Sequence, residues 1–229
     1  MSCIAVIPAR GGSKGIPNKN LVEVNGQSLV SRAITCAMQS GAVDFVVVSS
    51  DDRSILEEAK VAGAIAIQRP AHLSSDTAAI EDAIAHALHS FSENHSTPTT
   101  LVLLQPTSPL RQSSTISEAV RLFAENGSKG SVFGVIEAEH HPYKTLIVAD
   151  ATVQPVRTIE DLSRPRQDLP KAYRQSGSIY VVGVQDFLDN NSLFVSPVRW
   201  IEVSSEEAID VDTPADLEAV RKAAHDSNA

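Results

Sequence analysis

A basic, glycine-rich segment follows the first apolar run of the chain. Residues 8–20 read PARGGSKGIPNKN and include three cations and no acidic residue. Glycines allow backbone N–H groups to approach phosphate oxygens closely, and Arg10 and Lys14 add positive charge. The spacing matches neither the Walker loop nor the Gly-x-Gly-x-x-Gly motif. We predict a phosphate-binding loop, with a flexible basic surface loop as the alternative.

A pair of carboxylates stands near the other end of the chain. Asp210 and Asp212 are two residues apart, which places them on the same side of an extended segment. Two carboxylates about 4 Å apart repel by roughly 4 kcal/mol at an effective dielectric constant near 20. A hard cation relieves that repulsion, so the pair predicts an Mg²⁺ (or Mn²⁺) site, with solvated surface acids as the alternative.

The next acid, Asp216, has a different predicted role. Thr213, Pro214 and Asp216 have the spacing of a helix start, with Thr213 as the N-cap and proline at the first helical position. His86 and His89 lie three residues apart, but no suitable third ligand is near them in the sequence, so we expect no metal site there.

Short apolar runs and helical patterns alternate along the chain. The runs are Ile4–Ile7, Phe45–Val48, Leu101–Leu104, Val132–Ile136 and Ile179–Val182. Their lack of period-two alternation predicts strands buried on both faces. With 42% hydrophobic and only 4% aromatic residues, the chain suits helices packed on a sheet. We therefore predict an α/β fold with a mostly parallel open sheet flanked by helices.

The clearest helical pattern runs from Ile80 to Phe91, where apolar residues recur every three or four positions. Asp76 is the predicted cap of this helix. In open parallel sheets, ligands bind beyond the carboxyl ends of the strands. The loops after Ile7, Val48 and Leu104 are therefore the predicted site.

Residues 137–171 interrupt this alternation because they are rich in Pro, Arg and His and contain only short apolar runs. Loops longer than about 15 residues within compact domains are usually functional or disordered. We predict a single domain over residues 1–229, with 137–171 inserted as an excursion. A long surface connection is the alternative.

Charge and cysteine content narrow the possible partners. A net charge of −9 argues against general nucleic-acid binding, which needs a basic footprint. Cys3 and Cys36 have no paired or metal-ligand spacing and are predicted to be free thiols in a reducing compartment. The start of the sequence resembles no signal segment and we find no membrane-spanning run, so we expect a cytoplasmic protein.

Several of these segments, taken in order, resemble the acylneuraminate cytidylyltransferases, also called CMP-sialic acid synthetases. The resemblance rests on residues 8–20, 69–77, 103–111, 139–145, 165–167, 177–180 and 209–213. It covers nearly the whole chain and implies a Rossmann-like nucleotidyltransferase fold. It also implies a homodimer in which the excursion is exchanged across a two-fold axis, so that each site is completed by the neighbouring subunit.

The resemblance implies a role for each matching residue. The expected nucleotide-binding residues are Arg10, Gly11, Ser13, Lys14, Lys19, Asn20 and Arg69. The expected sugar-binding residues are Gln105, Lys144, Arg166, Ser176, Tyr180, Leu193 and Phe194, of which Lys144 and Arg166 would come from the partner subunit. Asp210 and Asp212 match the metal-binding pair.

Two departures bear on the choice of sugar. Ser176-Gly177 stands where the family usually has Asn-Gly, and Leu193-Phe194 stands where it usually has two aromatic residues. We expect both changes to leave catalysis intact and to loosen the sugar pocket.

The expected reaction is attack by the anomeric hydroxyl of N-acetylneuraminic acid, an acidic nine-carbon sugar, on the α-phosphorus of CTP, with release of pyrophosphate. Arg10, Lys14 and the metal would neutralise the developing charge, and Asp212, through a metal-bound water, is the candidate proton acceptor. The alternatives are legionaminic, pseudaminic or 3-deoxy-octulosonic acid as acceptor, or a nucleotide-binding module without catalysis.

Overall fold

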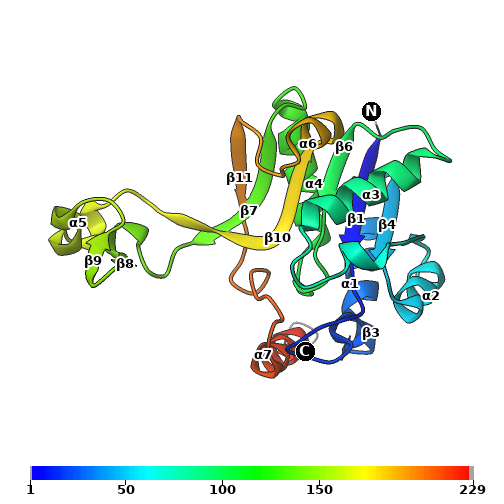
Figure 1. The fold of residues 1–229 in the computed structure, drawn as a ribbon, viewed down its shortest axis with the longest axis horizontal. Coiled ribbons are helices and arrows are strands. Elements are labelled where there is room, and N and C mark those ends of the chain that lie inside the picture. Colours follow the sequence, from blue (N-terminus) through cyan, green and yellow to red (C-terminus); the bar gives the residue numbers. More distant parts are fainter. Residues whose placement is uncertain (1, 227–229) are drawn as a thin grey trace.

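The structure is a computed structural model that describes residues 2–226 and is built on one central sheet (Figure 1). Within that range the sheet has seven strands in the order β11-β7-β10-β6-β1-β4-β5. They are β11 (Val198–Glu202), β7 (Ser131–Glu137), β10 (Tyr173–Gly183), β6 (Thr100–Leu103), β1 (Cys3–Pro8), β4 (Phe45–Ser50) and β5 (Ile65–Gln68). Only β10 runs antiparallel to its neighbours, so the predicted mostly parallel open sheet is confirmed.

All five predicted strands are present, whereas two edge strands were missed. β5 is only four residues long and three of them are half-buried. β11 reads VRWIE, and its side chains are mostly exposed. β11 has no continuous apolar run of the kind that marks a central strand, and the run within β5, Ile65–Ile67, is only three residues long.

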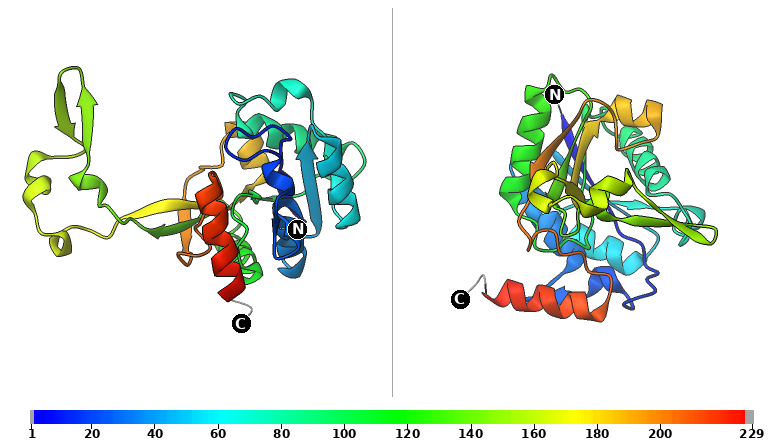
Figure 2. Two further views of the ribbon diagram at one scale, coloured as in Figure 1. Left: turned by 90° about the horizontal axis from the view of Figure 1, so that it is seen from below. Right: turned by 90° about the vertical axis from the view of Figure 1, so that its left-hand side faces the viewer.

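Helices cover both faces of the sheet (Figure 2). One face packs against α1 (Leu29–Gln39), α2 (Arg53–Val61) and α4 (Ser113–Glu125), and the other packs against α3 (Ile80–Ser92) and α6 (Val184–Asn190). Strand residues alternate between the two cores, since Ala5 and Ile7 lie in the first and Ile4 and Val6 in the second.

The predicted stripe of α3 is confirmed, but its predicted cap is wrong. Ala83, Ile84 and Phe91 are buried in the core. The N-cap position is Ala79, which makes no side-chain capping bond. Asp76 lies three residues earlier and is held instead by two cations, as described below.

A third apolar cluster joins the two ends of the described chain. Helix α7 (Pro214–Asp226) packs Leu217 and Val220 against Ile16 and against Val24 of the small β2–β3 hairpin (Glu23–Val24, Gln27–Ser28). The predicted start of α7 is confirmed, because Asp216 Oδ2 accepts from the Thr213 backbone N–H at 2.7 Å and Asp216 N–H donates to Thr213 Oγ1 at 3.3 Å.

The predicted excursion is an arm that projects between β7 and β10, away from the sheet (Figures 1 and 2). We call residues 138–172 the arm. It contains β8 (Leu146–Ala149), β9 (Thr152–Pro155), α5 (Ile159–Ser163) and the 3-10 turns η3 (Pro142–Lys144) and η4 (Arg166–Asp168). Two further 3-10 turns, η1 (Lys19–Leu21) and η2 (Ala71–Leu73), lie in the sheet domain. Residues 1 and 227–229 of the predicted single domain lie outside the described residues.

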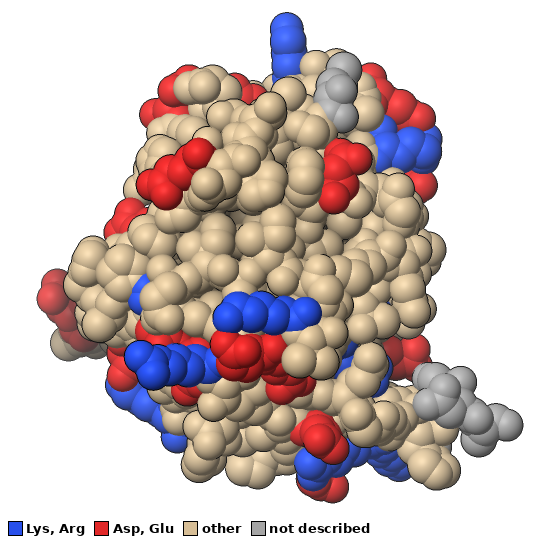
Figure 3. Space-filling model, turned by 90° about the vertical axis from the view of Figure 1, so that its right-hand side faces the viewer, with Lys and Arg blue, Asp and Glu red and all other residues tan. Residues whose placement is uncertain are grey.

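Charged side chains of both signs are visible on the surface (Figure 3). On the face shown in Figure 3, Lys and Arg side chains lie beside Asp and Glu rather than in a continuous basic area. Among residues 2–226, no helix combines the length and apolar character needed to cross a membrane.

Candidate functional site

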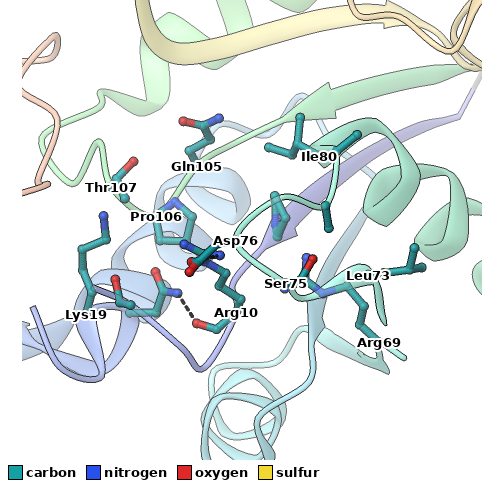
Figure 4. Close-up of a pocket in the computed structure, with 15 residues that line it drawn as sticks. Arg10, Lys19, Arg69, Leu73, Ser75, Asp76, Ile80, Gln105, Pro106 and Thr107 are labelled. Atoms are coloured by element: carbon teal, nitrogen blue, oxygen red, sulfur yellow. Dashed lines mark hydrogen bonds and ion pairs between the residues drawn. The ribbon is translucent and has the colours of Figure 1, made fainter. Parts of the chain in front are cut away.

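A cavity of about 250 Å³ opens beyond the carboxyl ends of β1 and β6, where the sequence predicted a ligand crevice (Figure 4). Its lining combines polar and charged groups with a small apolar wall. The lining residues are Pro8, Arg10, Ser13, Lys19, Asn20, Arg69, Leu73, Ser75, Asp76, Ala78, Ala79, Ile80, Gln105, Pro106 and Thr107. Five of the predicted nucleotide residues and the predicted sugar residue Gln105 therefore meet here.

The predicted phosphate loop is held by close packing at two of its glycines. A Cβ at Gly11 would lie 2.8 Å from the Cβ of Asp52, and a Cβ at Gly15 would overlap the carbonyl oxygen of Asp212. Gly11 N–H also donates to Asp51 Oδ1 at 3.0 Å. Glycine at these positions thus lets the loop approach both the loop after β4 and the segment with the carboxylate pair.

Two cations of the loop converge on one carboxylate. Arg10 Nη1 and Lys14 Nζ each lie 2.8 Å from an oxygen of Asp76. The hydrogen bond from Lys14, together with the nearby positive charges, lowers the pKa of the Asp76 carboxyl below its ordinary value. In Figure 4 Asp76 and Arg10 lie together at the centre of the cavity. The loop therefore binds an anionic group in this structure, and that group belongs to the protein.

Asn20 and Arg69 are the buried polar members of the lining. Asn20 Nδ2 donates to the Arg10 carbonyl oxygen at 2.9 Å and so orders the loop. Arg69 is 5% exposed, its nearest carboxylate oxygen, on Asp51, is 4.0 Å away, and its Nε and Nη2 have no hydrogen-bond partner within the described protein. Burial lowers the pKa of the Arg69 guanidinium. Buried donors are normally paired, so Arg69 is poised to bind an acceptor on a ligand.

Asp210 and Asp212 are both exposed, and the buried Val211 lies between them, as expected for an extended segment. Val211 N–H donates to the Thr107 carbonyl oxygen at 2.8 Å, which ties the pair to the loop after β6. The pKa of Asp210 is raised, first by loss of solvation and also by the charge of Asp212. Lys19 Nζ lies 2.9 Å from Asp212 Oδ1 and supplies part of the positive charge that the pair needs.

The described residues contain no group of three or more His, Cys, Asp or Glu side chains placed to hold a metal ion. A metal at Asp210 and Asp212 would thus take its remaining ligands from outside that set. The donor chemistry still fits, because two carboxylates are the usual protein share of an Mg²⁺ site that also binds phosphate oxygens.

Tyr180 and Phe194 form an aromatic wall beside the end of β6 and are not among the residues that line the cavity. Tyr180 is buried, pairs with Leu103 across β10 and β6, and donates its hydroxyl to Gln175 Oε1 at 3.3 Å. Burial, followed by the charge of Asp210, raises the pKa of Tyr180. The Phe194 ring stands edge-on to Tyr180, with 5.8 Å between centroids, and is 44% exposed.

Two other predicted sugar residues are core residues in this chain. Ser176 is 4% exposed, lies 2.8 Å from Ser178 Oγ and packs where a Cβ on Gly134 would otherwise stand. Leu193 belongs to the apolar cluster that includes Phe187. Neither side chain lines the cavity described above, and the looser sugar pocket expected from these positions stays a prediction.

Lys144 and Arg166 lie on the arm, and each donates a hydrogen bond to a backbone carbonyl of the arm itself. Lys144 Nζ donates to the Leu162 carbonyl oxygen at 3.1 Å, and Arg166 Nη2 donates to the Ala138 carbonyl oxygen at 2.9 Å. The residues that line the cavity come from positions 8–107, so the arm contributes no described residue to it within one chain.

Sequence reasoning missed three residues that the structure places at the site. Asp76 was assigned to a helix start because its spacing resembled a cap, although the run of cations in residues 8–20 was a signal that a nearby acid could pair with them. Asp51 and Thr107 follow two strands whose loops were predicted to matter, but their roles depend on contacts across the fold.

The chain matches the family described as Cytidylyltransferase over residues 4–190. N-acylneuraminate cytidylyltransferase from Streptococcus agalactiae serotype V is 32% identical over 219 residues, which cover 95% of this chain and 52% of the relative. CMP-N,N'-diacetyllegionaminic acid synthase from Legionella pneumophila is 31% identical, with 97% and 96% covered. Pseudaminic acid cytidylyltransferase from Campylobacter jejuni is 32% identical, with 95% and 94% covered. This chain spans about half the length of the streptococcal relative.

The fold is also that of known nucleotidyltransferases. A structure titled CMP:2-keto-3-deoxy-manno-octonic acid synthetase complexed with CTP has a TM-score of 0.74 and 19% identity, covering 99% of this chain and 100% of that chain. The 4-diphosphocytidyl-2C-methyl-D-erythritol synthase of Anaerococcus prevotii has a TM-score of 0.68 and 10% identity, with 98% of each chain covered. At these identities the likeness shows the fold.

Proposed function

Because this chain belongs to the cytidylyltransferase family, we propose that it transfers the cytidylyl group of CTP to the anomeric hydroxyl of N-acetylneuraminic acid. The products would be CMP-N-acetylneuraminate and pyrophosphate. The observation that carries the proposal is the cavity itself, in which the cations of the glycine-rich loop, the unpaired donors of Arg69 and the side chain of Gln105 meet.

The loop residues bind the triphosphate in this proposal. Arg10 and Lys14 already hold a carboxylate, so their geometry suits an anion, and phosphate oxygens would replace Asp76. Ser13 and the backbone of Gly11 would contact the phosphates. Asn20 would hold the loop from below through its bond to Arg10.

We propose that Asp210 and Asp212 hold the catalytic metal. Loss of solvation and, to a lesser degree, the charge of Asp212 raise the pKa of Asp210, and Lys19 already lies beside Asp212, so the pair favours a positive charge and suits a divalent ion. When bound, Mg²⁺ or Mn²⁺ would neutralise charge on the phosphate oxygens. Lys19 would then be free to turn toward the nucleotide.

The proposed step is a displacement at the α-phosphorus. A bond forms from the anomeric oxygen to phosphorus, the bond from phosphorus to the bridging oxygen breaks, and pyrophosphate leaves with that electron pair. The hydroxyl proton passes to a base, for which Asp212 is our candidate. Arg10 and Lys14 would stabilise the charge that develops on the leaving group.

We propose that the acceptor lies between Gln105 and the aromatic wall of Tyr180 and Phe194. A sugar carboxylate needs cations as well as amide donors, and the cavity side of Gln105 supplies only the amide. Lys144 and Arg166 of a second copy would supply the cations. The arm exposes Ile147, Val148 and Val153, which supports its burial against another subunit in a homodimer.

Other acidic sugars are the alternative acceptors. The relatives from Legionella and Campylobacter are named for legionaminic and pseudaminic acid, and they align over almost their full length. A structural neighbour named for an octulosonic-type acid extends the set. A nucleotide-binding module without catalysis is less well supported, because both carboxylates are present, exposed and tied through Val211 to Thr107, which lines the cavity.

The test is a pyrophosphate-release assay with CTP, ATP, GTP and UTP, each offered with a panel of acidic sugars. We expect CTP with N-acetylneuraminic acid to be the best pair, with N-glycolylneuraminic acid used comparably. A clear preference for legionaminic, pseudaminic or 3-deoxy-octulosonic acid would overturn the choice of acceptor. CTP binding without pyrophosphate release for any sugar would overturn the enzyme assignment.

A further inference from the structure

Arg111 is a buried arginine that connects the two walls of the acceptor side. It lies in the loop between β6 and α4 and is 5% exposed. Its Nη2 donates to the Gln105 carbonyl oxygen at 2.7 Å. Its Nε donates to the Ser178 carbonyl oxygen of β10. One planar guanidinium therefore holds backbone from both strands.

These two carbonyls lie where the sheet ladder has ended. β6 and β10 pair through Leu103 and Tyr180. Continuing that antiparallel register by two residues places Ser178 opposite Gln105. β6 ends at Leu103, however, and the pairing of β10 with β7 shifts between Gln175 and Tyr180. Arg111 thus replaces strand pairing at the point where Gln105 must leave the ladder and turn toward the cavity.

The charge of Arg111 is not used in a direct ion pair. Among the described residues, no carboxylate oxygen lies within 4.0 Å of its guanidinium. Burial lowers the pKa of Arg111 to about 10, while the charges of Cys36, Glu207 and Asp210 act in the opposite direction. A buried cation bonded only to neutral carbonyls is costly to keep, which argues that its two fixed bonds serve the geometry above it.

We propose that Arg111 is the positioning residue of the acceptor side: it holds Gln105 and the Tyr180 strand at a set separation and thereby determines affinity for the acidic sugar but not for CTP. This inference rests on the proposed function, in which Gln105 contacts the acceptor. The phosphate loop has its own hydrogen bonds, from Asn20 to the Arg10 carbonyl and from Gly11 N–H to Asp51, and neither of them involves Arg111.

The test compares Arg111→Lys with Arg32→Lys. Arg32 is a matched control because its guanidinium also donates to backbone carbonyls, those of Pro109 on the same loop at 3.1 Å and of Val24 at 3.3 Å, without touching Gln105 or Ser178. Losing a charge-assisted bond in Arg111→Lys is expected to raise KM for the sugar about tenfold, with KM for CTP within about twofold of wild type. Arg32→Lys is expected to leave both values within about twofold.

A purely structural role predicts another result. If KM for CTP and for the sugar rise together, or if Arg32→Lys reproduces the split, the proposal is overturned. Arg111→Gln is a second variant at the same position. If neither Arg111→Lys nor Arg111→Gln shows a cooperative thermal transition above the assay temperature, the proposal is also overturned. Combining Arg111→Lys with Gln105→Ala should add little to the sugar KM of Gln105→Ala alone, because the two residues act through one contact.

A measurement without turnover separates this inference from the proposed function. Amide hydrogen exchange at residues 104–108 and 176–180 is expected to speed up about tenfold in Arg111→Lys and to remain unchanged in Arg32→Lys. If wild type uses no acidic sugar, the proposed function fails while the exchange result still decides whether Arg111 holds these segments. Unchanged exchange in Arg111→Lys would overturn the positioning role itself.

Discussion

The sheet domain and the arm are stabilised by different kinds of interaction. In the sheet domain, strands buried on both faces pack against helices on each side. The arm has a buried carboxylate at its centre: Asp161, whose side chain is 3% exposed, accepts from Thr158 and lies near Arg157 and Arg164. The apolar side chains of the β8–β9 hairpin point outward instead.

The two regions therefore differ in how far each buries its apolar surface within a single chain. The sheet domain buries its apolar surface by itself and brings five predicted nucleotide-binding residues together at one cavity within one chain. The arm pairs its own polar groups but exposes apolar side chains. Its two predicted sugar-binding cations, Lys144 and Arg166, do not line the cavity of the same chain. Exposed apolar patches often mark interaction sites, so the arm is the region that the proposed homodimer would bury.

Removing a cation of the glycine-rich loop should have the largest effect on activity, because in the proposed function this loop binds the triphosphate without help from a second chain. Lys14→Ala is expected to lower kcat/KM by about 10²- to 10³-fold, since Lys14 stabilises charge on the leaving group. Its side chain is 80% exposed, so the thermal midpoint should stay within about 2 °C of wild type. Pyrophosphate release and differential scanning fluorimetry measure the two quantities.

The matched control for this variant is Lys60→Ala. Lys60 is also an exposed lysine paired with a carboxylate, Glu57, at 2.7 Å, but it stands on α2. It should retain full activity. Near-normal activity in Lys14→Ala would remove the loop from the catalytic site.

Mixing variants tests whether the arm serves the neighbouring subunit. Lys144→Ala and Lys14→Ala are each expected to be inactive, but equal mixing should restore about a quarter of wild-type activity, because half of the dimers would contain one intact site. The activity of the mixture after subunit exchange, verified by native mass spectrometry, is the measurement. Verified exchange without any recovered activity would show that each site is built from a single chain.

Asp161→Asn should loosen the arm and spare the sheet domain. Loss of the buried carboxylate charge leaves Arg157 and Arg164 without their partner, and since both arginines are about half exposed, we expect a local cost of about 1 to 3 kcal/mol. Hydrogen exchange should accelerate within 138–172 and stay unchanged in β1 and β6. Glu160→Gln, at the exposed neighbouring position, is the control. Equal acceleration in both regions would mean that the arm and the sheet unfold as one unit.

The smallest expected effect comes from Asp76→Asn, which removes the protein's own anion from the nucleotide cavity. Arg10 and Lys14 would then be free for phosphates, so affinity for CTP should rise about two- to fivefold. Isothermal titration calorimetry measures it. Weaker CTP binding in the variant would show that Asp76 instead holds the two cations in their binding positions.

The pH dependence of this effect follows from the direction of the pKa shift. Lys14 and Arg10 lower the pKa of Asp76. The carboxylate therefore stays charged and paired at every pH above this lowered pKa, and the pairing is lost only as pH falls through it. The ratio of CTP affinities between variant and wild type should therefore be constant from about pH 5 to 8. A ratio that falls toward one as pH drops to 5 would contradict the shift.

The sequence by itself was sufficient for the fold class, the central strands and the start of α7, and it identified the basic glycine-rich loop whose phosphate binding stays a prediction. Each of these depends on neighbours close in sequence or on continuous burial, which leaves a local pattern of residue types. The spacing of Asp210 and Asp212 placed both on one side of an extended segment, while the interest in Gln105 came from the family resemblance. Sequence reasoning failed for the edge strands, where burial is partial, and for Asp76, whose spacing resembled a cap.

Only the tertiary structure decided which groups meet across the fold. The pairing of Asp76 with Arg10 and Lys14, the contact of Lys19 with Asp212 and the bridge from Arg111 to Ser178 join residues 62 to 193 positions apart. The burial of Ser176 and Leu193, which the family likeness assigned to the sugar, likewise became visible only in the tertiary structure. Sequence patterns record which face an element buries; they do not record which side chain on another element will stand opposite, because that depends on how the layers pack.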